Sequence, residues 1–348
     1  MAVVTTNLHS NMKLSVLDQS SASKGKTQDV AIRETLALAR HCDALGYSRY
    51  WVSEHHNSGN IVGTAPEVLM AAIAATTQRI RVGSAGIMLP HYSALKVAEQ
   101  FRVLEAIAPG RIDMGVGRAP GSDQLTARAL NPHPDNVEDH FPRQVQELQY
   151  WVSGTTLPEG HPFRRVVASP TGPTTPDLWM LGSSDYGAQL AGYFGLPYAF
   201  AYFFAEGVGV EQALDLYRKN FRPSALYPKP KATICVWALA ADTDEEAQWQ
   251  FKSRERSSID RDFGIRLPLI PPEEAAARVL NPAEQAISER LRRKAIIGSA
   301  ATVAEKLNDL AKKLDLDELV IVTWTYDPEP RRRSYELLAE AFSLPKAG

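Results

Sequence analysis

Cysteine is nearly absent from this sequence. Its 348 residues include two cysteines, Cys42 and Cys235, which are too few for a disulfide framework or a cysteine-ligated zinc site. They also lie too far apart for a CxxC redox pair. We therefore interpret both as small buried apolar residues and expect a cytoplasmic protein.

Long hydrophobic runs and a strong charge imbalance are absent as well. No stretch approaches the roughly 20 apolar residues of a membrane span. Acidic residues number 40 and basic residues 38, for a formal net charge of -2, so no general field attracts nucleic acid or an anionic membrane. Residues 1–11 lack the apolar core of a signal peptide. We expect residues 1–11 to be a disordered extension and residues 12–348 to form one domain.

Short strand-like segments alternate with helical segments along almost the whole chain. Each predicted strand precedes a helix with apolar residues at spacings of three and four. Eight such units predict an α/β fold, a single closed (β/α)8 TIM barrel with loop insertions. An open doubly wound sheet is the competitor, but residues 18–20 (DQS) after the first strand form no glycine-rich turn. The predicted strands are 13–17, 49–52, 81–89, 112–116, 178–181, 198–203, 233–239 and 319–324.

Two segments interrupt this alternation. Residues 153–176 are rich in proline and predict an irregular excursion, whereas residues 242–297 are long, charged and partly helical. A barrel enzyme that must exclude water needs a closing loop, and we expect one of these insertions to provide it.

Polar residues that could carry chemistry follow the second predicted strand. Glu54, His55 and His56 are consecutive, so at most two of their side chains point into the barrel mouth together. An imidazole titrates near neutral pH, which indicates an acid/base role at the end of a barrel strand. The alternatives are a metal site, which needs further ligands from other strand ends, and a buried polar cluster that holds the loop.

Two loops offer groups that could bind an anion. Residues 115–121 (GVGRAPG) do not match a dinucleotide fingerprint, because the third glycine is one place late and Pro120 lies inside the turn. They predict instead a loop that approaches a ligand closely while Arg118 faces a phosphate. Ser183 and Ser184 precede a predicted helix whose free N–H groups and dipole favour an anion. A surface arginine beside a glycine turn and a plain serine N-cap are the structural alternatives.

Small and aromatic residues occupy the remaining strand ends. Ala85 and Gly86, in the third predicted strand, leave room for a flat ring against the backbone. Trp237 and Trp324 fit either a substrate pocket or packing at the barrel rim. The aromatic residues near these ends predict a largely apolar substrate: Tyr202, Phe203, Phe204, Trp237 and Trp324.

Several of these segments, in this order, resemble the bacterial luciferase-like monooxygenase family of flavin-dependent oxidoreductases. The resemblance runs from about residue 13 to residue 342 and is most specific at residues 50–56 (YWVSEHH). Its supporting parts are residues 81–90 (RVGSAGIMLP), 109–118 (PGRIDMGVGR) and 297–307 (IGSAATVAEKL).

The resemblance implies a specific oxygenase chemistry. It implies a TIM barrel that binds reduced FMN, delivered by a separate flavin reductase, and that reacts with O2 through a C4a-peroxyflavin to oxygenate a small organic substrate. It also implies that His55 is the catalytic histidine and that Glu54 lies beside the flavin. A homodimer is a further expectation at the level of the family.

The resemblance also assigns the remaining cofactor contacts. Arg118, Ser183 and Ser184 match the site of the flavin phosphate. Ala85 and Gly86 match the strand end that packs under the isoalloxazine ring, where we expect a cis peptide bond. Gly117 stands where luciferase has a reactive cysteine, so we expect no thiol chemistry beside the flavin.

Three other functions stay open at this point. Relatives of this family transfer hydride with the deazaflavin F420 and use no oxygen, and His55 would then serve the substrate. A second alternative is a non-catalytic flavin-binding protein. A third is a metal-dependent hydrolase that uses His55 and His56.

Overall fold

The computed structural model describes residues 12–132, 137–204 and 206–345. The extension expected at residues 1–11 lies outside these described residues. Within them, none of the helices combines the length and the apolar character needed to cross a membrane.

Eight parallel strands form a closed barrel, as the alternation in the sequence predicts. The ring closes because the last strand pairs on both sides, with Val16↔Ile321 joining it to the first strand and Val322↔Trp237 joining it to β8. The strands of the ring are β1 (Lys13–Asp18), β2 (Arg49–Val52), β3 (Arg81–Ser84), β5 (Ile112–Gly117), β6 (Asp177–Gly182), β7 (Tyr198–Phe200), β8 (Ala232–Ala241) and β10 (Glu318–Val322).

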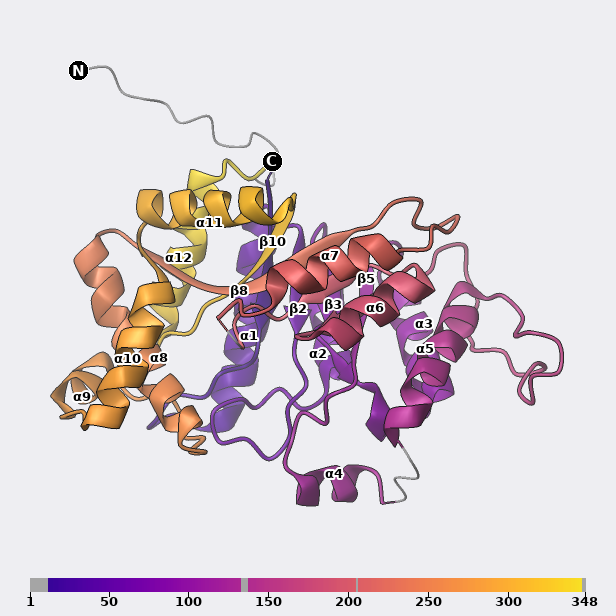
Figure 1. The fold of residues 1–348 in the computed structure, drawn as a ribbon, viewed down its shortest axis with the longest axis horizontal. Helices are drawn as coiled ribbons and strands as arrows, with labels where there is room; N and C mark the ends of the chain where they lie inside the picture. Colours follow the sequence, from indigo (N-terminus) through magenta and orange to yellow (C-terminus); the bar gives the residue numbers. More distant parts are fainter. Residues whose placement is uncertain (1–11, 133–136, 205, 346–348) are drawn as a thin grey trace.

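Amphipathic helices follow the strands and cover the outside of the barrel (Figure 1). The first of them buries Ala31, Leu38 and Cys42 and ends at Gly46, whose φ of 90° is left-handed, a conformation that favours glycine. These helices are α1 (Gln28–Leu45), α2 (Pro66–Thr76), α3 (Ala94–Ile107), α5 (Val137–Ser153), α6 (Asp185–Phe194), α7 (Val210–Asn220), α11 (Ala300–Leu314) and α12 (Pro328–Ala341).

Three predicted strands are longer than the strands of the structure. The segment 81–89 is interrupted at the cis peptide bond between Ala85 and Gly86, after which come β4 (Ile87–Met88) and the short 3-10 helix η1 (Leu89–His91). The segment 198–203 leaves the ladder after Phe200, where the backbone turns. The segment 319–324 ends at Val322, so Trp324 lies beyond the last strand.

The two insertions differ in structure. Residues 154–176 are irregular, as predicted. Residues 242–297, predicted to be partly helical, contain α8 (Asp244–Asp262), α9 (Pro272–Ala277), α10 (Pro282–Lys294) and β9 (Ile296–Ser299). The extra strand pairs with the end of β8 through Ala238↔Ile296, where β8 extends beyond its pairing with β10. The loop after β5 also holds the short helix α4 (Gln124–Leu130).

A buried ionic network fills the amino-terminal end of the barrel. Arg49 of β2 donates from Nη1 to Asp113 Oδ2 at 2.7 Å and from Nε to Glu318 Oε1 at 2.8 Å. Asp113 also accepts from Arg81 Nη2 at 2.7 Å and from the indole Nε1 of Trp51 at 2.9 Å. These contacts join β2, β3, β5 and β10 and satisfy charges that would otherwise be costly to bury.

An aromatic layer lies above this network. The rings of Trp51 and Trp179 are fully buried and meet edge to face with centroids 5.2 Å apart. A side chain at Gly83 would come within 2.6–2.7 Å of Trp51 and Asp113, so glycine is required there. Side chains therefore fill the amino-terminal end of the barrel, and its open space lies toward the carboxyl ends of the strands.

The network predicts a large stability effect at Asp113. Replacing Asp113 by Asn leaves Arg49 and Arg81 without their shared carboxylate, so we expect a loss of about 3–5 kcal/mol in the free energy of unfolding. Urea denaturation measures this loss. The control is Asp242→Asn, which removes an exposed partner of Arg333 and should change stability by less than about 1 kcal/mol. A loss in Asp113→Asn no greater than in the control would contradict the role of the network.

Candidate active site

Glu54, two residues after the end of β2, is a fully buried carboxylate with three polar partners. Its Oε1 accepts from Tyr92 Oη at 2.6 Å and contacts His56 Nε2 at 2.7 Å, and its Oε2 accepts from the Met88 N–H at 2.8 Å. Burial, and then the hydrogen bond to Glu54, raise the pKa of Tyr92 far above its ordinary value, so the phenol stays protonated. The carboxylate is thereby fixed between the ends of β2 and β4.

His55 is partly buried and lies apart from this carboxylate cluster. Its Nδ1 lies 3.2 Å from Ser53 Oγ, and the side chain lines a cavity at the barrel mouth. Burial, followed by the nearby charges of Arg266 and His56, lowers the pKa of His55 to about 4. The imidazole is therefore neutral at pH 7, with one ring nitrogen as a donor and the other as an acceptor.

The cis peptide bond that follows β3 lies beside the end of β2. The N–H of Ala85 donates to the carbonyl of Val52 at 2.8 Å, which places this peptide next to the residues that lead into Glu54 and His55. A Cβ on Gly86 would meet the Leu181 side chain and would lie 2.8 Å from the Gly115 carbonyl oxygen. Only glycine allows β3, β5 and β6 to approach so closely at this point.

Arg118 and the start of α6 come together after β5 and β6. The Arg118 guanidinium stacks over the Tyr186 ring at 4.3 Å, and this ring is in the first turn of α6. Ser183 and Ser184 are exposed, and Ser184 occupies the N-cap position without a capping hydrogen bond from its side chain. A Cβ on Gly117 would meet nothing within 4 Å. A cation, two hydroxyl groups and a helix N-terminus thus face open space, an arrangement that suits an anion.

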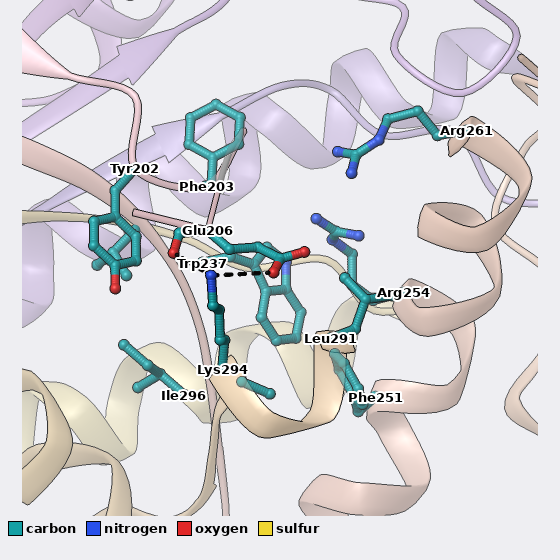
Figure 2. Close-up of a pocket in the computed structure, with 12 residues that line it drawn as sticks. Tyr202, Phe203, Glu206, Trp237, Phe251, Arg254, Arg261, Leu291, Lys294 and Ile296 are labelled. Carbon is teal, nitrogen blue, oxygen red and sulfur yellow. Dashed lines mark hydrogen bonds and ion pairs between the residues drawn. The ribbon is translucent and has the colours of Figure 1, made fainter. Parts of the chain in front are cut away.

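Two neighbouring cavities open at the barrel mouth. The cavity beside His55 includes both late tryptophans, Trp237 and Trp324, in its wall. The second cavity is lined by Tyr202 and lacks His55 (Figure 2). Phe203 and Trp237 border both, so Tyr202 belongs to the adjoining chamber rather than to the His55 chamber.

The walls of both cavities are completed by the insertion 242–297. Arg254, Ser257, Ser258 and Arg261 of α8, with Arg266 just after it, face the chamber of His55. No residue of segment 153–176 lines either cavity. Figure 1 shows α8–α10 on one side of the barrel and α5, which precedes that segment, on the opposite side.

The family model described as Luciferase-like monooxygenase matches residues 12–316. The chain belongs to this family. Among the curated relatives, the "Luciferase-like monooxygenase" of Escherichia coli (strain K12) is 39% identical over 323 residues, covering 93% of this chain and 95% of the relative. The "N-acetyl-S-alkylcysteine monooxygenase" of Bacillus subtilis (strain 168) is 36% identical over 332 residues, covering 95% and 98%.

Solved structures with this fold bind different cofactors. The structure of apo-MsnO8 is 35% identical with a TM-score of 0.86 and covers 97% of this chain and 100% of that one. The structure of the oxygenating constituent of 3,6-diketocamphane monooxygenase from Pseudomonas putida is in complex with FMN. It is 20% identical with a TM-score of 0.70 and covers 97% of this chain and 100% of that one. An F420-dependent secondary alcohol dehydrogenase, at 13% identity and a TM-score of 0.69, covers 95% and 99%. These last two show the fold alone.

Family membership confirms the resemblance seen in the sequence, and with it an oxidoreductase of the monooxygenase type. The structure brings His55, Trp237 and Trp324 into one chamber, and it brings Arg118 to the start of α6 beside Ser183 and Ser184. Among the described residues no group of three or more His, Cys, Asp and Glu side chains is placed to hold a metal ion, so the two adjacent histidines lack further ligands.

Sequence reasoning missed the arginines of the chamber: Arg254, Arg261 and Arg266. They lie in or after a helix that buries polar residues such as Ser253 and Glu255 and therefore shows no apolar stripe of helical period. The one available signal was the serine- and arginine-rich stretch 253–258 (SRERSS) inside the charged insertion.

The lowered pKa of His55 predicts how it titrates. As the pH falls, the unfolded chain takes up the proton near pH 6.5 and the folded chain only near pH 4, so the stability contributed by neutral His55 is lost between these values. We expect the ring resonance of His55, assigned with His55→Gln, to titrate in an NMR experiment at least about one unit below the ordinary value. Titration of His55 near pH 6.5 would contradict a buried neutral imidazole.

Proposed function

We propose that this protein is a monooxygenase that uses reduced FMN and O2 to oxygenate a small organic molecule. The observation that carries the proposal is the juxtaposition, at adjacent strand ends, of an anion site, a cis peptide and a neutral histidine in a chamber walled by tryptophans. A phosphorylated flavin has the two matching parts, an anionic tail and a flat ring. When bound, reduced FMN supplies two electrons, so that one atom of O2 enters the substrate and the other leaves as water.

Different residues of the chain would bind the phosphate and the ring of this cofactor. Arg118, Ser183 and Ser184 would hold the phosphate, with the N-terminal N–H groups of α6. Ala85, Gly86 and Glu54 would border the ring, because their strand ends adjoin. Gly86 adds no side chain, and Glu54 is fixed by Tyr92 and the Met88 N–H so that it cannot swing into the ring site.

His55 and the late tryptophans would act on the substrate side. A neutral imidazole can donate one hydrogen bond and accept another, and His55 remains in this form across the physiological pH range. Trp237 and Trp324 are 9% and 7% exposed and would give the substrate an apolar surface in the chamber. The electrons would come from a separate flavin reductase, as the resemblance to the family implies.

The proposal predicts that the protein changes how reduced FMN reacts with oxygen. In stopped-flow absorbance, mixing protein and reduced FMN with aerated buffer should give a transient species that outlasts the one seen with free flavin. His55→Ala should shorten its lifetime while FMN binding persists. Reoxidation indistinguishable from free flavin, together with hydride transfer from reduced F420, would replace oxygenation by the deazaflavin alternative. Bound FMN with no such transient and no hydride transfer would indicate a binding protein.

The phosphate site predicts a selective loss in Arg118→Met. This variant should bind FMN about 10–100-fold more weakly, the value expected when a charge-assisted hydrogen bond is removed. Riboflavin, which lacks the phosphate, should bind the variant and the parent alike. Arg164→Met, at an exposed arginine of segment 153–176, is the matched control in fluorescence titrations. Equal losses for FMN and riboflavin would place the phosphate elsewhere.

A further inference from the structure

Arg254 of α8 is a buried cation that lacks an ionic partner. It is 7% exposed, and within the described chain its guanidinium makes no hydrogen bond or ion pair, its Nε being fully enclosed. Its neighbours on the same helix are paired, Glu255 with Arg292 at 2.6 Å and Arg256 with Glu284 at 2.8 Å. Burying an unpaired guanidinium is unfavourable, so this exception requires an explanation from the site.

Two aromatic faces and further hydrogen-bond donors lie close to Arg254. Its guanidinium lies 5.5 Å from the Trp237 ring and 5.1 Å from the Trp324 ring. The buried indole Nε1 atoms of both tryptophans also have no acceptor among the described residues. Figure 2 shows the guanidinium of Arg261 directed toward the same space as that of Arg254. These groups offer donors and no acceptor of their own.

The balance of charge in the two cavities is positive. The chamber of His55 is lined by Arg254, Arg261 and Arg266 and by no acidic side chain. In the adjoining cavity the carboxylate of Glu206 is engaged by Lys294 at 3.8 Å and, from outside, by Arg290 at 3.3 Å (Figure 2). Burial, and then Arg261, lower the pKa of Arg254 to about 9, which still leaves it charged at pH 7.

The flavin phosphate does not account for this charge. The anion site of Arg118 lies at the ends of β5 and β6, whereas Arg254 packs over Trp237 of β8 and Trp324 after β10. β7 separates β6 from β8 in the ring. The barrel mouth thus carries two separate cationic sites, of which FMN needs one.

We propose that Arg254 binds the carboxylate of an anionic organic substrate, whose apolar part lies against Trp237 and Trp324. His55 lines the same chamber. With its carboxylate anchored at Arg254, the substrate would have its other end held near His55 and the proposed flavin ring. This substrate class rests on the proposed monooxygenase function and refines the expectation of a largely apolar substrate. A guanidinium suits the role because its planar fork binds both carboxylate oxygens.

The test is a binding measurement on the flavin-free protein. 4-Phenylbutanoate and its neutral counterpart 4-phenylbutanamide would be titrated against the intrinsic tryptophan fluorescence. The carboxylate should bind the parent at least about tenfold more tightly than the amide, and Arg254→Met should bring the two to within about twofold. Arg254→Lys should retain part of the preference, and Arg278→Met, at an exposed arginine outside both cavities, all of it.

Two further readouts separate this role from a structural one. Without ligand, Arg254→Met should melt no lower than the parent, because methionine replaces an unpaired charge by an apolar side chain. Its affinity for FMN should be unchanged. Equal binding of carboxylate and amide by the parent, no binding of either, or a loss of FMN affinity in Arg254→Met would each overturn the proposal. Since no flavin or oxygen is used in the titration, its failure is distinct from a failure of the monooxygenase function.

Discussion

The barrel depends on one buried guanidinium, that of Arg49, between Asp113 and Glu318. Three strands that lie far apart in the sequence are joined at this point, and Arg81 and the Trp51 indole complete the donors to Asp113. Each carboxylate is balanced by a cation inside the barrel, which keeps the pKa of Asp113 below its ordinary value although burial alone would raise it. Because these charged side chains, together with Trp51 and Trp179, fill the amino-terminal end of the barrel, a ligand has room only toward the carboxyl ends of the strands.

The sequence predicted the alternating architecture well because it depends on local patterns. Strand β2, for example, has the predicted bounds. The cis peptide at Ala85 was expected only from the family resemblance, since no local pattern predicts it. Strand ends were less predictable. After Phe200 the apolar run continues in the sequence, but the chain leaves the strand in a turn that is stabilised by hydrogen bonds to β6 and β8.

The candidate site was predictable in part for the same reason. His55 and Arg118 follow barrel strands, and that position alone singles them out. Arg254 lies in a helix of an insertion, and its importance arises from tertiary packing over Trp237 and Trp324 and from the absence of a counter-ion among the described residues. Neither property has a signature in residue spacing. Helices whose buried face is polar are those in which periodicity gives least information.

In the proposed arrangement, two separate cationic sites at the barrel mouth bind the cofactor and the substrate. The proposed anion site at the start of α6 is exposed, which would suit a cofactor that arrives from solution and leaves again. Arg254, in the chamber that α8 lines, is buried, so its charge interacts strongly with a ligand that enters. Neutral His55 borders that chamber and, through its backbone, adjoins the carboxylate cluster of Glu54.

A crystal structure of the protein with FMN is the most direct test of this division. The proposed arrangement predicts phosphate density at Arg118, Ser183 and Ser184, with the ring beside Ala85 and Gly86 and the Arg254 chamber free of the cofactor. Phosphate density at Arg254, or a ring located away from the cis peptide, would contradict it.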